Sequence, residues 1–558
     1  MGRGIRRGVR IPAYLRMVLL GALVFCAAPA GRAAPINGNL ALVPPMGWND
    51  WAHYQCNFTA QTILDNAQAL VKTGLAARGY DTVTIDDCWM LKDRDANGNL
   101  QPDPQRFPHG MKAVADTVHG LGLKFGIYED SGYDTCGGFA GSGVPKGGGK
   151  DHFLQDAKLF ASWGVDYLKL DGCNVWVPKG GSKNAAYRSA YAAEAEALKQ
   201  VGRPTVFSES APAYFQGTPG WYTVLTWVKG DGQLWREGTD IATFDAANAD
   251  KPRFDSVLWN YAYNLPLGRF QEPGNWNDAD FIIGGDGGIT LAETRSQLAL
   301  WSMMSAPLIL SSDLDKLSPQ AIGILSNRAV IAVDQDPLGR EATLVRRNQQ
   351  VDVLFKPLQD GDYAIAAANR DSQPVRVELH PAELGFAGSG CRLDAQNLWT
   401  GSRQTSLSTL QTEVAGQDAE IWRVHAGSGC GRPTRTGAIV ATANVPGHDH
   451  GFEGYAQCLS AAGNVGECQG SQAESWTVAA GGVLKAEGKC LGVEGGKPVM
   501  QACAGGAAEH WRYTLAGNLI SGGHQCLTGG ESGLSLAACG HNRTDQIWSL
   551  PNEGAPHR

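Results

Sequence analysis

Short apolar runs alternate with amphipathic segments between about residue 40 and residue 340. Four runs are rich in β-branched and aromatic residues, and each ends in polar side chains: Thr82–Ile85, Leu123–Ile127, Asp166–Leu170 and Thr205–Phe207. The segments between them have apolar residues at helical spacing, as in Gln61–Thr73, Met111–Gly120 and Ala185–Val201. A repeat of about forty residues suits a βα unit with loops, so the pattern predicts an α/β fold with parallel strands.

The length of this region favours one architecture. About 300 residues suit a (β/α)8 (TIM) barrel with insertions, predicted over 40–340. An open doubly wound sheet is the alternative. No Gly-x-Gly-x-x-Gly turn follows a first strand, which argues against the dinucleotide-binding form of that sheet. In a barrel, polar residues after the strands belong to the face that carries the chemistry.

The pattern changes after Pro337 to short alternating strands separated by turns. They are predicted at Val351–Phe355, Tyr363–Ala368, Val375–Leu379, Asn397–Trp399 and Glu420–Val424. This predicts an antiparallel β-sandwich over 341–426 with a structural role. A Gly/Pro/Arg/Thr-rich linker follows over 427–436.

The segment 437–552 repeats itself three times. Each unit has a Cys-Leu pair, a second cysteine and a Glu-x-Trp or Gln-x-Trp motif. The three units resemble a ricin-type β-trefoil. Sugar-binding members of that family commonly have an Asp after the Cys-hydrophobic pair, where this chain has Ser460, Gly492 and Thr528. An inert spacer and a weak polysaccharide-binding module therefore both remain open for the trefoil.

The N-terminus has the features of an export signal. Five arginines precede an apolar run of fourteen residues, Met17 to Ala30, and small residues follow at Ala33 and Ala34. This order predicts a secretory signal peptide over 1–34. A membrane span needs about 20 apolar residues, and no later stretch reaches that length. The mature protein is therefore expected to be secreted, either extracellular or periplasmic, with no membrane span.

Composition and cysteine content limit the classes of protein to which this chain can belong. Hydrophobic residues make up 43% of the 558 residues, and the formal net charge is −8, so a nucleic-acid partner is not expected. Cys26 lies in the predicted signal, and twelve cysteines remain, an even number that suits an oxidising compartment. None forms a Cys-x-x-Cys pair with a matching pair of histidines, and we expect neither a metal nor a cofactor.

Two carboxylates suffice to hydrolyse a glycosidic bond, and two candidates stand out. Asp171 ends a predicted strand just after Lys169, whose ammonium would lower the pKa of the carboxyl and keep it ionised as a nucleophile. Asp240 lies four residues after Arg236 in a predicted loop. Opposite an ionised Asp171, it would be pushed toward protonation and could act as the general acid.

The region 43 to about 340, and more weakly the chain to about 425, resembles the melibiases, glycoside hydrolase family 27. Ordered motifs carry the resemblance: Pro44-Pro45-Met46-Gly47-Trp48-Asn49-Asp50-Trp51, Ile85-Asp86-Asp87-Cys88-Trp89, Tyr167-Leu168-Lys169-Leu170-Asp171-Gly172-Cys173, Arg236-x-x-x-Asp240 and Trp276-Asn277-Asp278-Ala279-Asp280. The family implies a retaining double displacement with Asp171 as nucleophile and Asp240 as acid/base, their carboxyl groups about 5–5.5 Å apart.

The resemblance also implies the other site residues. Asp86 and Asp87 match the pair that binds the O4 and O6 hydroxyls of the sugar, and Lys169 and Arg236 match further sugar contacts. Trp48 and Tyr128 match the walls of the pocket, and Asp280 matches a further polar wall residue. Cys56–Cys88 and Cys136–Cys173 match family disulfides. Cys391–Cys430 is paired by elimination, and the trefoil motifs pair Cys458 with Cys468, Cys490 with Cys503, and Cys526 with Cys539.

The loop after Phe207 bears on specificity. In strict α-galactosidases of animal type within the family, a Glu and a Leu face the C2 substituent of the sugar. In the α-N-acetylgalactosaminidases these residues are Ser and Ala. Alignment on Pro212 places Ser210 and Ala213 there and also fits Tyr214, which leaves room for an acetamido group. The alternative alignment makes Glu209 the residue that contacts C2.

The sequence thus predicts a secreted exo-α-glycosidase acting on terminal α-galactosides of oligosaccharides or glycoconjugates, with acceptance of or preference for N-acetylgalactosamine. A strict α-galactosidase is the alternative. A β-L-arabinopyranosidase of the same family would have Glu in place of Asp87. A non-catalytic carbohydrate-binding protein is the alternative from another class.

Overall fold

The computed structural model describes residues 39–441, 457–530, 533–540 and 543–551. The predicted signal segment lies outside these ranges. Eight parallel strands form one sheet in the order β7-β6-β5-β4-β3-β2-β1-β8. Their bounds are Met46–Asn49 (β1), Thr82–Ile85 (β2), Lys124–Asp130 (β3), Tyr167–Asp171 (β4), Val206–Glu209 (β5), Leu234–Arg236 (β6), Trp276–Asp278 (β7) and Leu308–Leu310 (β8). A parallel bridge from Ile282 to Leu310 closes the ring, so the predicted (β/α)8 barrel is confirmed.

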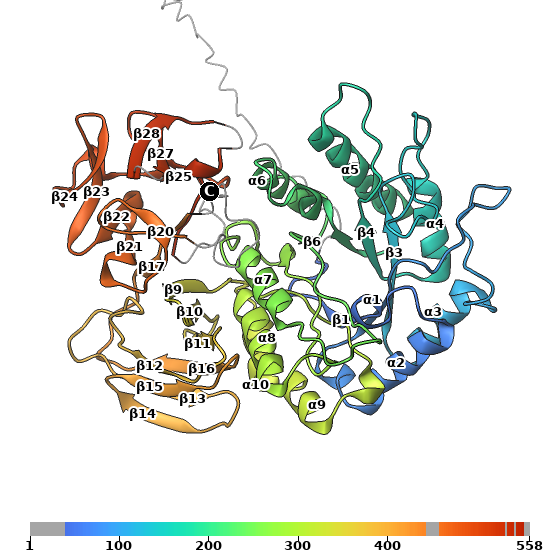
Figure 1. Cartoon of the computed structure of the whole chain (residues 1–558), viewed down its shortest axis with the longest axis horizontal. Helices are drawn as coiled ribbons and strands as arrows, with labels where there is room; N and C mark the ends of the chain where they lie inside the picture. The colour runs from blue at the N-terminus through green and yellow to red at the C-terminus, as the bar shows by residue number, and fades with distance from the viewer. Residues whose placement is uncertain (1–38, 442–456, 531–532, 541–542, 552–558) are drawn as a thin grey trace, which may run out of the picture. The chain divides into compact units, whose positions relative to one another are not determined.

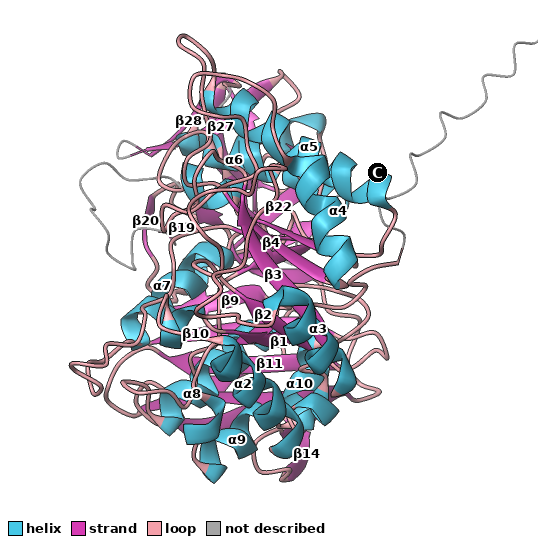
Figure 2. Ribbon diagram, turned by 90° about the vertical axis from the view of Figure 1, so that its right-hand side faces the viewer, coloured by secondary structure: helices cyan, strands magenta, loops and turns pink. Residues whose placement is uncertain are grey.

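Helices surround these strands on the outer side (Figure 2). They are Trp51–Tyr54 (α1), Ala60–Lys72 (α2), Gly110–Gly120 (α3), Phe153–Trp163 (α4), Lys183–Val201 (α5), Trp221–Leu225 (α6), Phe254–Asn264 (α7), Leu291–Met304 (α8), Pro319–Leu325 (α9) and Arg328–Asp334 (α10). Helix α2 shows why these segments are helical, since Ile63, Ala67 and Leu70 share one face and are buried. Helix α8 begins at a capping box made by Thr290 and Glu293.

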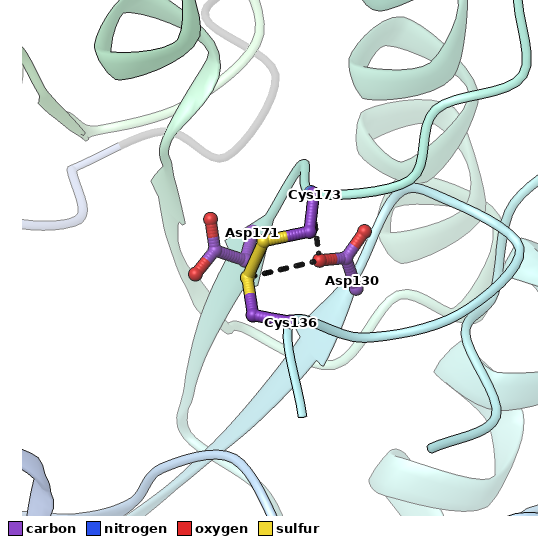
Figure 3. A group of neighbouring side chains, drawn as sticks. All are labelled: Asp130, Cys136, Asp171 and Cys173. Carbon is purple, nitrogen blue, oxygen red and sulfur yellow. Dashed lines mark hydrogen bonds between the residues drawn. A yellow bond between two sulfur atoms is a disulfide. The ribbon is translucent and has the colours of Figure 1, made fainter. Parts of the chain in front are cut away.

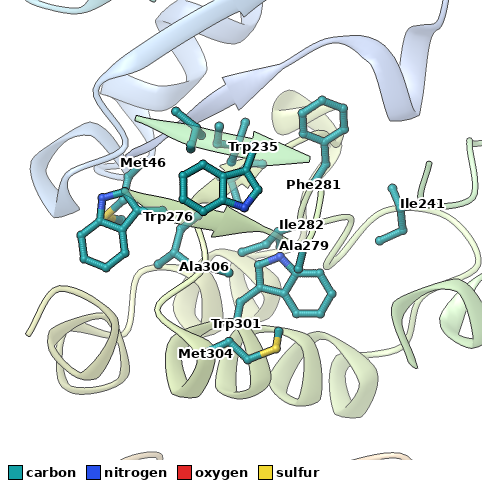
Figure 4. Packing of buried hydrophobic residues seen from close by; sticks show 14 of the residues in the cluster. Met46, Trp235, Ile241, Trp276, Ala279, Phe281, Ile282, Trp301, Met304 and Ala306 are labelled. Carbon is teal, nitrogen blue, oxygen red and sulfur yellow. The ribbon is translucent and has the colours of Figure 1, made fainter. Parts of the chain in front are cut away.

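Three tryptophans belong to the buried cluster around the later strands and α8 (Figure 4). Trp235 on β6, Trp276 on β7 and Trp301 on α8 are each fully buried. The Trp301 indole N–H donates to the carbonyl of Asp280 at 2.8 Å. Because a buried indole N–H needs a partner, this bond fixes both the helix and the chain segment that follows β7.

Close strand contacts in the barrel require glycine at two positions. A Cβ on Gly47 of β1 would lie 2.3 Å from the carbonyl oxygen of Thr82, and one on Gly126 of β3 would lie 2.3 Å from Oγ1 of Thr84. Neither neighbour can be avoided without moving a strand. Both glycines therefore set the spacing of the strands that carry the site residues.

The antiparallel domain follows the barrel, as Figure 1 shows in yellow and orange. One sheet has the order β14-β13-β16-β11-β10-β9, and β12 pairs with β15. The bounds are Thr343–Arg347 (β9), Val351–Pro357 (β10), Tyr363–Asn369 (β11), Val375–Leu379 (β12), Leu393–Asn397 (β13), Arg403–Leu407 (β14), Leu410–Val414 (β15) and Ala419–Ala426 (β16). The antiparallel sandwich is thereby confirmed.

One predicted strand of the sandwich is wrong. The chain at Asn397–Trp399 forms the end of β13 and a turn, because the Asn397 side chain accepts hydrogen bonds from the backbone N–H groups of Trp399 and Thr400. Asparagine favours such turns over continued strand pairing. The strand lies instead over Leu393–Asn397, which pairs with β14 and β16.

The described residues of the trefoil form three small antiparallel sheets. Its strands are Arg435–Ala438 (β17), Val440–Ala441 (β18), Gln457–Leu459 (β19), Val465–Glu467 (β20), Ser475–Ala479 (β21), Val483–Ala486 (β22), Lys489–Glu494 (β23), Lys497–Ala502 (β24), Arg512–Tyr513 (β25), Leu519–Ile520 (β26), Gln525–Gly530 (β27), Gly533–Ala538 (β28) and Trp548–Ser549 (β29). Strand β17 pairs with β21, so the trefoil begins at Arg435, inside the predicted linker.

The repeated tryptophans are core residues. The indole N–H groups of Trp476, Trp511 and Trp548 donate to the carbonyls of Leu459, Leu491 and Leu527, the leucines that follow the first cysteine of each unit. Each ring is at most 2% exposed. The motif thus ties the end of each unit to its beginning.

The structure forms all six expected disulfides. They are Cys56–Cys88, Cys136–Cys173, Cys391–Cys430, Cys458–Cys468, Cys490–Cys503 and Cys526–Cys539. Among the described residues, no helix combines the length and apolarity of a membrane-crossing segment.

Candidate active site

Acidic and basic side chains gather where the barrel strands end. Asp86 and Asp87 follow β2, Asp171 ends β4, Arg236 ends β6, and Asp280 follows β7. Because parallel strands point the same way, their C-terminal ends meet on one face. A small cavity below these groups is lined by residues that include Lys169, Ser208, Arg236 and Asp278.

Lys169 lies at the centre of the cluster. Its Nζ donates to Oδ2 of Asp86 at 2.6 Å and lies 5.2 Å from the ring centres of both Tyr128 and Phe281. Burial opposes the charged ammonium, but the carboxylates of Asp86, Asp171 and Asp240 outweigh it and raise the pKa of Lys169. The lysine therefore stays positive beside the carboxylates.

Asp171 is held from three sides. The hydroxyl of Tyr214 donates to Oδ1, which also accepts the backbone N–H of Gly172 at 2.9 Å. The hydroxyls of Tyr187 and Tyr191 donate to the carbonyls of Gly172 and Leu170, which fixes the end of β4. Burial raises the pKa of Asp171, and the Lys169 ammonium and the Tyr214 hydrogen bond offset only part of that effect.

Asp240 has a different environment. Its side chain is 61% exposed, and its Oδ1 lies 3.1 Å from Nη2 of Arg236. Partial burial raises the pKa of Asp240, but Arg236, Lys169 and a hydrogen bond from the Trp51 side chain together lower it below the ordinary value. The expected protonation pattern is therefore wrong for the free protein: Asp171 has the raised pKa and Asp240 the lowered one.

The carboxylates after β2 are fixed by the backbone. Asp86 accepts from Lys169, from the Asn49 amide at 2.7 Å and from the backbone N–H of Asp87. Asp87 accepts the N–H of Cys88 at 2.6 Å and that of Gly137 at 2.7 Å. Both carboxyl groups are held rigidly at the end of the strand, as the binding of sugar hydroxyls requires.

Tyr128 presents a buried hydroxyl without a hydrogen-bond partner among the described residues. Burial and then the charges of Asp171, Asp130, Asp87 and Asp86 raise its pKa, so it stays a neutral donor. An unpaired buried hydroxyl is costly unless something occupies the site. A hydroxylated ligand would satisfy it.

Asp130 secures the loop beside Asp171 (Figure 3). Its carboxylate accepts the backbone N–H groups of Gly132 at 2.6 Å and Cys173 at 2.9 Å. Ligand atoms of Asp130, Cys136, Asp171 and Cys173 lie within 4.8 Å of one another. The two sulfur atoms form a disulfide and are therefore not thiolate ligands, so this cluster does not have the donor set of a metal site.

Trp48 does not line the pocket, contrary to the prediction. It is fully buried, and its indole N–H donates to the carbonyl of Ser312 at 2.9 Å. Side chains alternate along β1, so the inward position belongs to Asn49, which contacts Asp86, and Trp48 faces the outer layer. The indole beside Asp240 is that of Trp51, a half-buried residue that the sequence analysis missed.

A second missed residue is Phe281, whose ring flanks Lys169. Its only signal in the sequence was its place directly after Asp280. Asp280 itself is 2% exposed and accepts from Arg236 at 2.9 Å and from the backbone N–H of Ile241. Burial raises its pKa to about 6.

The geometry of the loop after β5 distinguishes between the two alignments of the specificity residues. Ser208 lines the inner cavity, so the next residue, Glu209, faces outward. A Cβ on Gly232 would lie 2.5 Å from Oε1 of Glu209, which places that carboxyl against the segment before β6. Ser210 and Ala213 lie in the turn that brings Tyr214 to Asp171. The geometry thus disfavours Glu209 as a sugar contact.

The trefoil positions that could hold a sugar-binding acid have no carboxylate. The Thr528 hydroxyl donates to the carbonyl of Cys526 and accepts from the Gln546 amide. The Ser460 hydroxyl accepts the N–H of Ala462, and Gly492 has no side chain. Threonine and serine here serve the local fold.

Comparisons with known proteins agree with this architecture. The profile described as alpha galactosidase A matches residues 43–336, that of the alpha galactosidase C-terminal beta sandwich domain matches 348–424, and that of the ricin-type beta-trefoil lectin domain matches 454–548. The chain belongs to the melibiases, glycoside hydrolase family 27. A melibiase is a glycoside hydrolase, so the non-catalytic alternative is excluded.

The names of individual relatives refer to two kinds of sugar. Alpha-galactosidase A of Aspergillus niger is 37% identical over 527 residues, 92% of each chain. Alpha-N-acetylgalactosaminidase of Gallus gallus is 38% identical over 392 residues, 67% of this chain and 90% of its own. The solved alpha-galactosidase I of Mortierella vinacea has a TM-score of 0.62 at 26% identity and covers 71% of this chain and 100% of its own.

Proposed function

We propose that this melibiase hydrolyses terminal α-D-galactosides by a retaining double displacement, with Asp171 as nucleophile and Asp240 as acid/base. The observation that carries this proposal is the setting of Asp171 at the end of β4, where a tyrosine hydroxyl donates to its carboxylate and the charge of Lys169 favours the ionised form. Attack on C1 by Oδ2, the oxygen that Tyr214 and Gly172 leave free, forms a glycosyl ester. Water then cleaves the ester.

The acid/base role requires a proton on Asp240 at the moment the leaving oxygen departs. In the free protein, Arg236 favours the ionised form. A bound sugar excludes water from the pocket, which raises the pKa of an exposed carboxyl. Asp240 then gives its proton to the leaving oxygen, and as a carboxylate it takes a proton from the water that attacks the ester.

The test of these roles is substitution of each acid. Asp171→Asn should lower turnover of nitrophenyl α-galactoside by at least about a thousandfold, because the amide cannot attack C1. Asp116→Asn, the same exchange at an exposed carboxylate of α3, is the matched control and should leave turnover unchanged. Turnover retained in Asp171→Asn would refute the nucleophile assignment.

We further propose that the enzyme accepts α-linked N-acetylgalactosamine. Ser210 and Ala213 are small, and the carboxyl of Glu209 faces Gly232. The relative from Gallus gallus, named alpha-N-acetylgalactosaminidase, is 38% identical over 392 residues, and the alpha-galactosidase A of Aspergillus niger is 37% identical over 527 residues. The small side chains of Ser210 and Ala213 leave volume for an acetyl group, and the serine provides a hydroxyl for its carbonyl.

Exchange of these two side chains tests the specificity. The double variant Ser210→Glu/Ala213→Leu should lower kcat/KM for the acetamido sugar at least about tenfold relative to galactose, because the larger side chains fill the space beside C2. Ser210→Ala, which keeps the space, should lower the ratio far less. An unchanged ratio in the double variant contradicts the assignment.

We propose in addition that the protein is exported. Six disulfides among the described residues suit an oxidising compartment. Expression of the full sequence should release protein whose new N-terminus lies near residue 35. Retention of the intact N-terminus in the cell would contradict export.

A further inference from the structure

The segment that carries Asp240 has no regular secondary structure. Strand β6 ends at Arg236 and helix α7 begins at Phe254, so the general acid lies on an irregular stretch of the chain. Its side chain is 61% exposed, which leaves little packing to hold it. A general acid must stay within hydrogen-bond reach of the leaving oxygen, so other residues have to fix this segment.

The backbone on either side of Asp240 has several near attachments. The N–H of Thr239 donates to the Gln216 side chain at 2.9 Å, and the N–H of Ile241 donates to Oδ2 of Asp280 at 2.7 Å. These bonds lie on the β5 and β7 sides of the segment. The N–H of Ala242 also donates to Oγ of Ser256 at 3.1 Å, and none of these three bonds involves a residue after Ala242 in the segment before Arg253.

Phe244 provides a further attachment two residues after Ala242. Its N–H donates to the carbonyl of Ala52 at 2.7 Å, and its carbonyl accepts from the Gln55 side chain at 2.9 Å. Its ring stacks on that of His53 with a centroid distance of 4.4 Å and an interplanar angle of 10°. The guanidinium of Arg253 lies over the same ring at 5.7 Å.

A single carboxylate holds both groups that flank the ring. Oδ1 of Asp286 lies 2.8 Å from Nδ1 of His53, and Oδ2 accepts from Nη2 of Arg253 at 2.7 Å. Asp286 is 7% exposed, so the bonds are little weakened by solvent. Arg253 also donates to the carbonyl of Ala242, within the segment itself.

The helix that receives Phe244 also reaches the acid. Trp51, two residues before His53 in α1, hydrogen-bonds Asp240 through its side chain. One short helix therefore contacts both the carboxyl and the anchor of its loop. Displacement of Phe244 would move the backbone of Asp240 relative to Trp51.

We propose that Phe244, clamped between His53 and Arg253, is a positioning residue for the acid/base Asp240. This inference rests on the proposed function, since it assigns Phe244 a role only through Asp240. Phe244 itself touches no reacting atom. Its contribution is to keep the carboxyl where proton transfer to the leaving oxygen can occur.

The test is the dependence of rate on the leaving group. Departure of dinitrophenolate needs little proton donation, whereas departure of an alkoxide needs a proton. Phe244→Ala should lower kcat/KM about tenfold or more for methyl α-galactoside and less than about threefold for the dinitrophenyl galactoside. Phe244→Tyr keeps the ring and should restore the methyl substrate to near the original rate.

Two controls separate positioning from loss of stability. Tyr363 and Phe355 in the sandwich form a comparable stacked pair, with centroids 5.0 Å apart at 15°. Tyr363→Ala should lower the melting temperature while leaving the ratio of the two rates unchanged. Phe244→Leu serves as a milder variant if Phe244→Ala does not fold, with a smaller loss on the methyl substrate only.

Asp240→Ala sets the reference and distinguishes the two claims. Should Asp240→Ala slow both substrates equally, the acid/base assignment itself fails. Asp240→Ala is expected to slow the methyl substrate selectively. If it does, and Phe244→Ala and Phe244→Leu each slow the two substrates equally or not at all, the acid/base assignment of Asp240 stands and the positioning role of Phe244 is refuted.

Discussion

At the scale of single residues, the site depends on several carboxylates that lie close together. Cations among them offset their mutual repulsion. Lys169 lies between Asp86 and Asp171, and Arg236 lies between Asp240 and Asp280. Each cation lowers the free energy of the neighbouring anions at short range. Burial raises the pKa of both acids, and the direct pairing of Arg236 with Asp240 then leaves Asp171 with the higher pKa in the free protein.

The raised pKa of Asp171 makes the acid limb of the pH profile sensitive to its hydrogen bonds. The Tyr214 hydroxyl favours the ionised carboxyl, so Tyr214→Phe should raise the pKa further. The nucleophile is active when ionised, and the acid limb of kcat/KM should therefore move to higher pH, with a larger loss at pH 4 than at pH 7. Tyr187→Phe, whose hydroxyl binds Gly172, should leave the limb in place. A limb that moves to lower pH in Tyr214→Phe contradicts this account.

Some residues could be placed from the sequence and others could not. Asp86, Asp87, Lys169 and Arg236 meet on one face because strand ends fix them. The motif contains two tryptophans and does not by itself show which of them lines the pocket. In the structure, β1 directs Asn49 inward and Trp48 outward. The pKa order of Asp171 and Asp240 could not be derived, since it depends on burial and on distances across the site.

At the scale of elements, strands and helices with a clear hydrophobic periodicity could be predicted from the sequence. Predictions failed where local side-chain hydrogen bonds determine the backbone. Thr82–Ile85 and Val375–Leu379 are strands at the predicted residues, whereas the side chain of Asn397 makes a turn where a strand was expected. The loop 131–143 beside β3 has no such period. Asp130 and the disulfide Cys136–Cys173 shape it.

The two disulfides of similar loop length allow stability and catalysis to be separated. Cys136–Cys173 spans 37 residues beside Asp171, and Cys391–Cys430 spans 39 residues in the sandwich. Replacement of either pair by serine should cost about 2–4 kcal/mol of unfolding free energy, because the unfolded chain gains similar freedom. Only the first should lower kcat, by about tenfold or more, since it frees the loop beside the nucleophile.

Unfolding in denaturant and steady-state rates measure both effects. Equal losses of kcat in the two double variants would show that the disulfide beside Asp171 has no special role. A large difference in stability between them would contradict the loop-length argument.

At the scale of the whole molecule, the sandwich is joined to the barrel through helix α8. Arg295 of α8 donates to Glu420 of β16 at 2.6 Å. Lys356 of β10 is fully buried, and its Nζ donates to the carbonyl of Ser302 and the hydroxyl of Ser305. Burial lowers the pKa of this lysine to about 8, which the nearby carboxylates of Asp334, Asp336 and Glu341 only partly oppose.

Because the pKa of Lys356 is lowered, its contribution to the free energy of unfolding changes with pH in a direction that can be worked out. Between about pH 8 and the ordinary value of 10.5, the unfolded chain keeps the proton that the folded protein has lost. Stability from this group therefore rises with pH, by about 1.4 kcal/mol per unit. The wild type should gain unfolding free energy relative to Lys356→Met between pH 8 and pH 9.5. A difference that stays constant or falls contradicts the buried, neutral lysine.

The central claim is that Asp171 forms a covalent bond to C1 of the sugar. The most direct measurement uses a fluorinated galactosyl fluoride, whose electron-poor ring slows hydrolysis of the glycosyl ester, followed by intact mass and peptide mapping. The account predicts one added sugar on the peptide that contains Asp171, and none in Asp171→Asn. An adduct on another carboxylate, or a first-formed free sugar of inverted configuration, would contradict it.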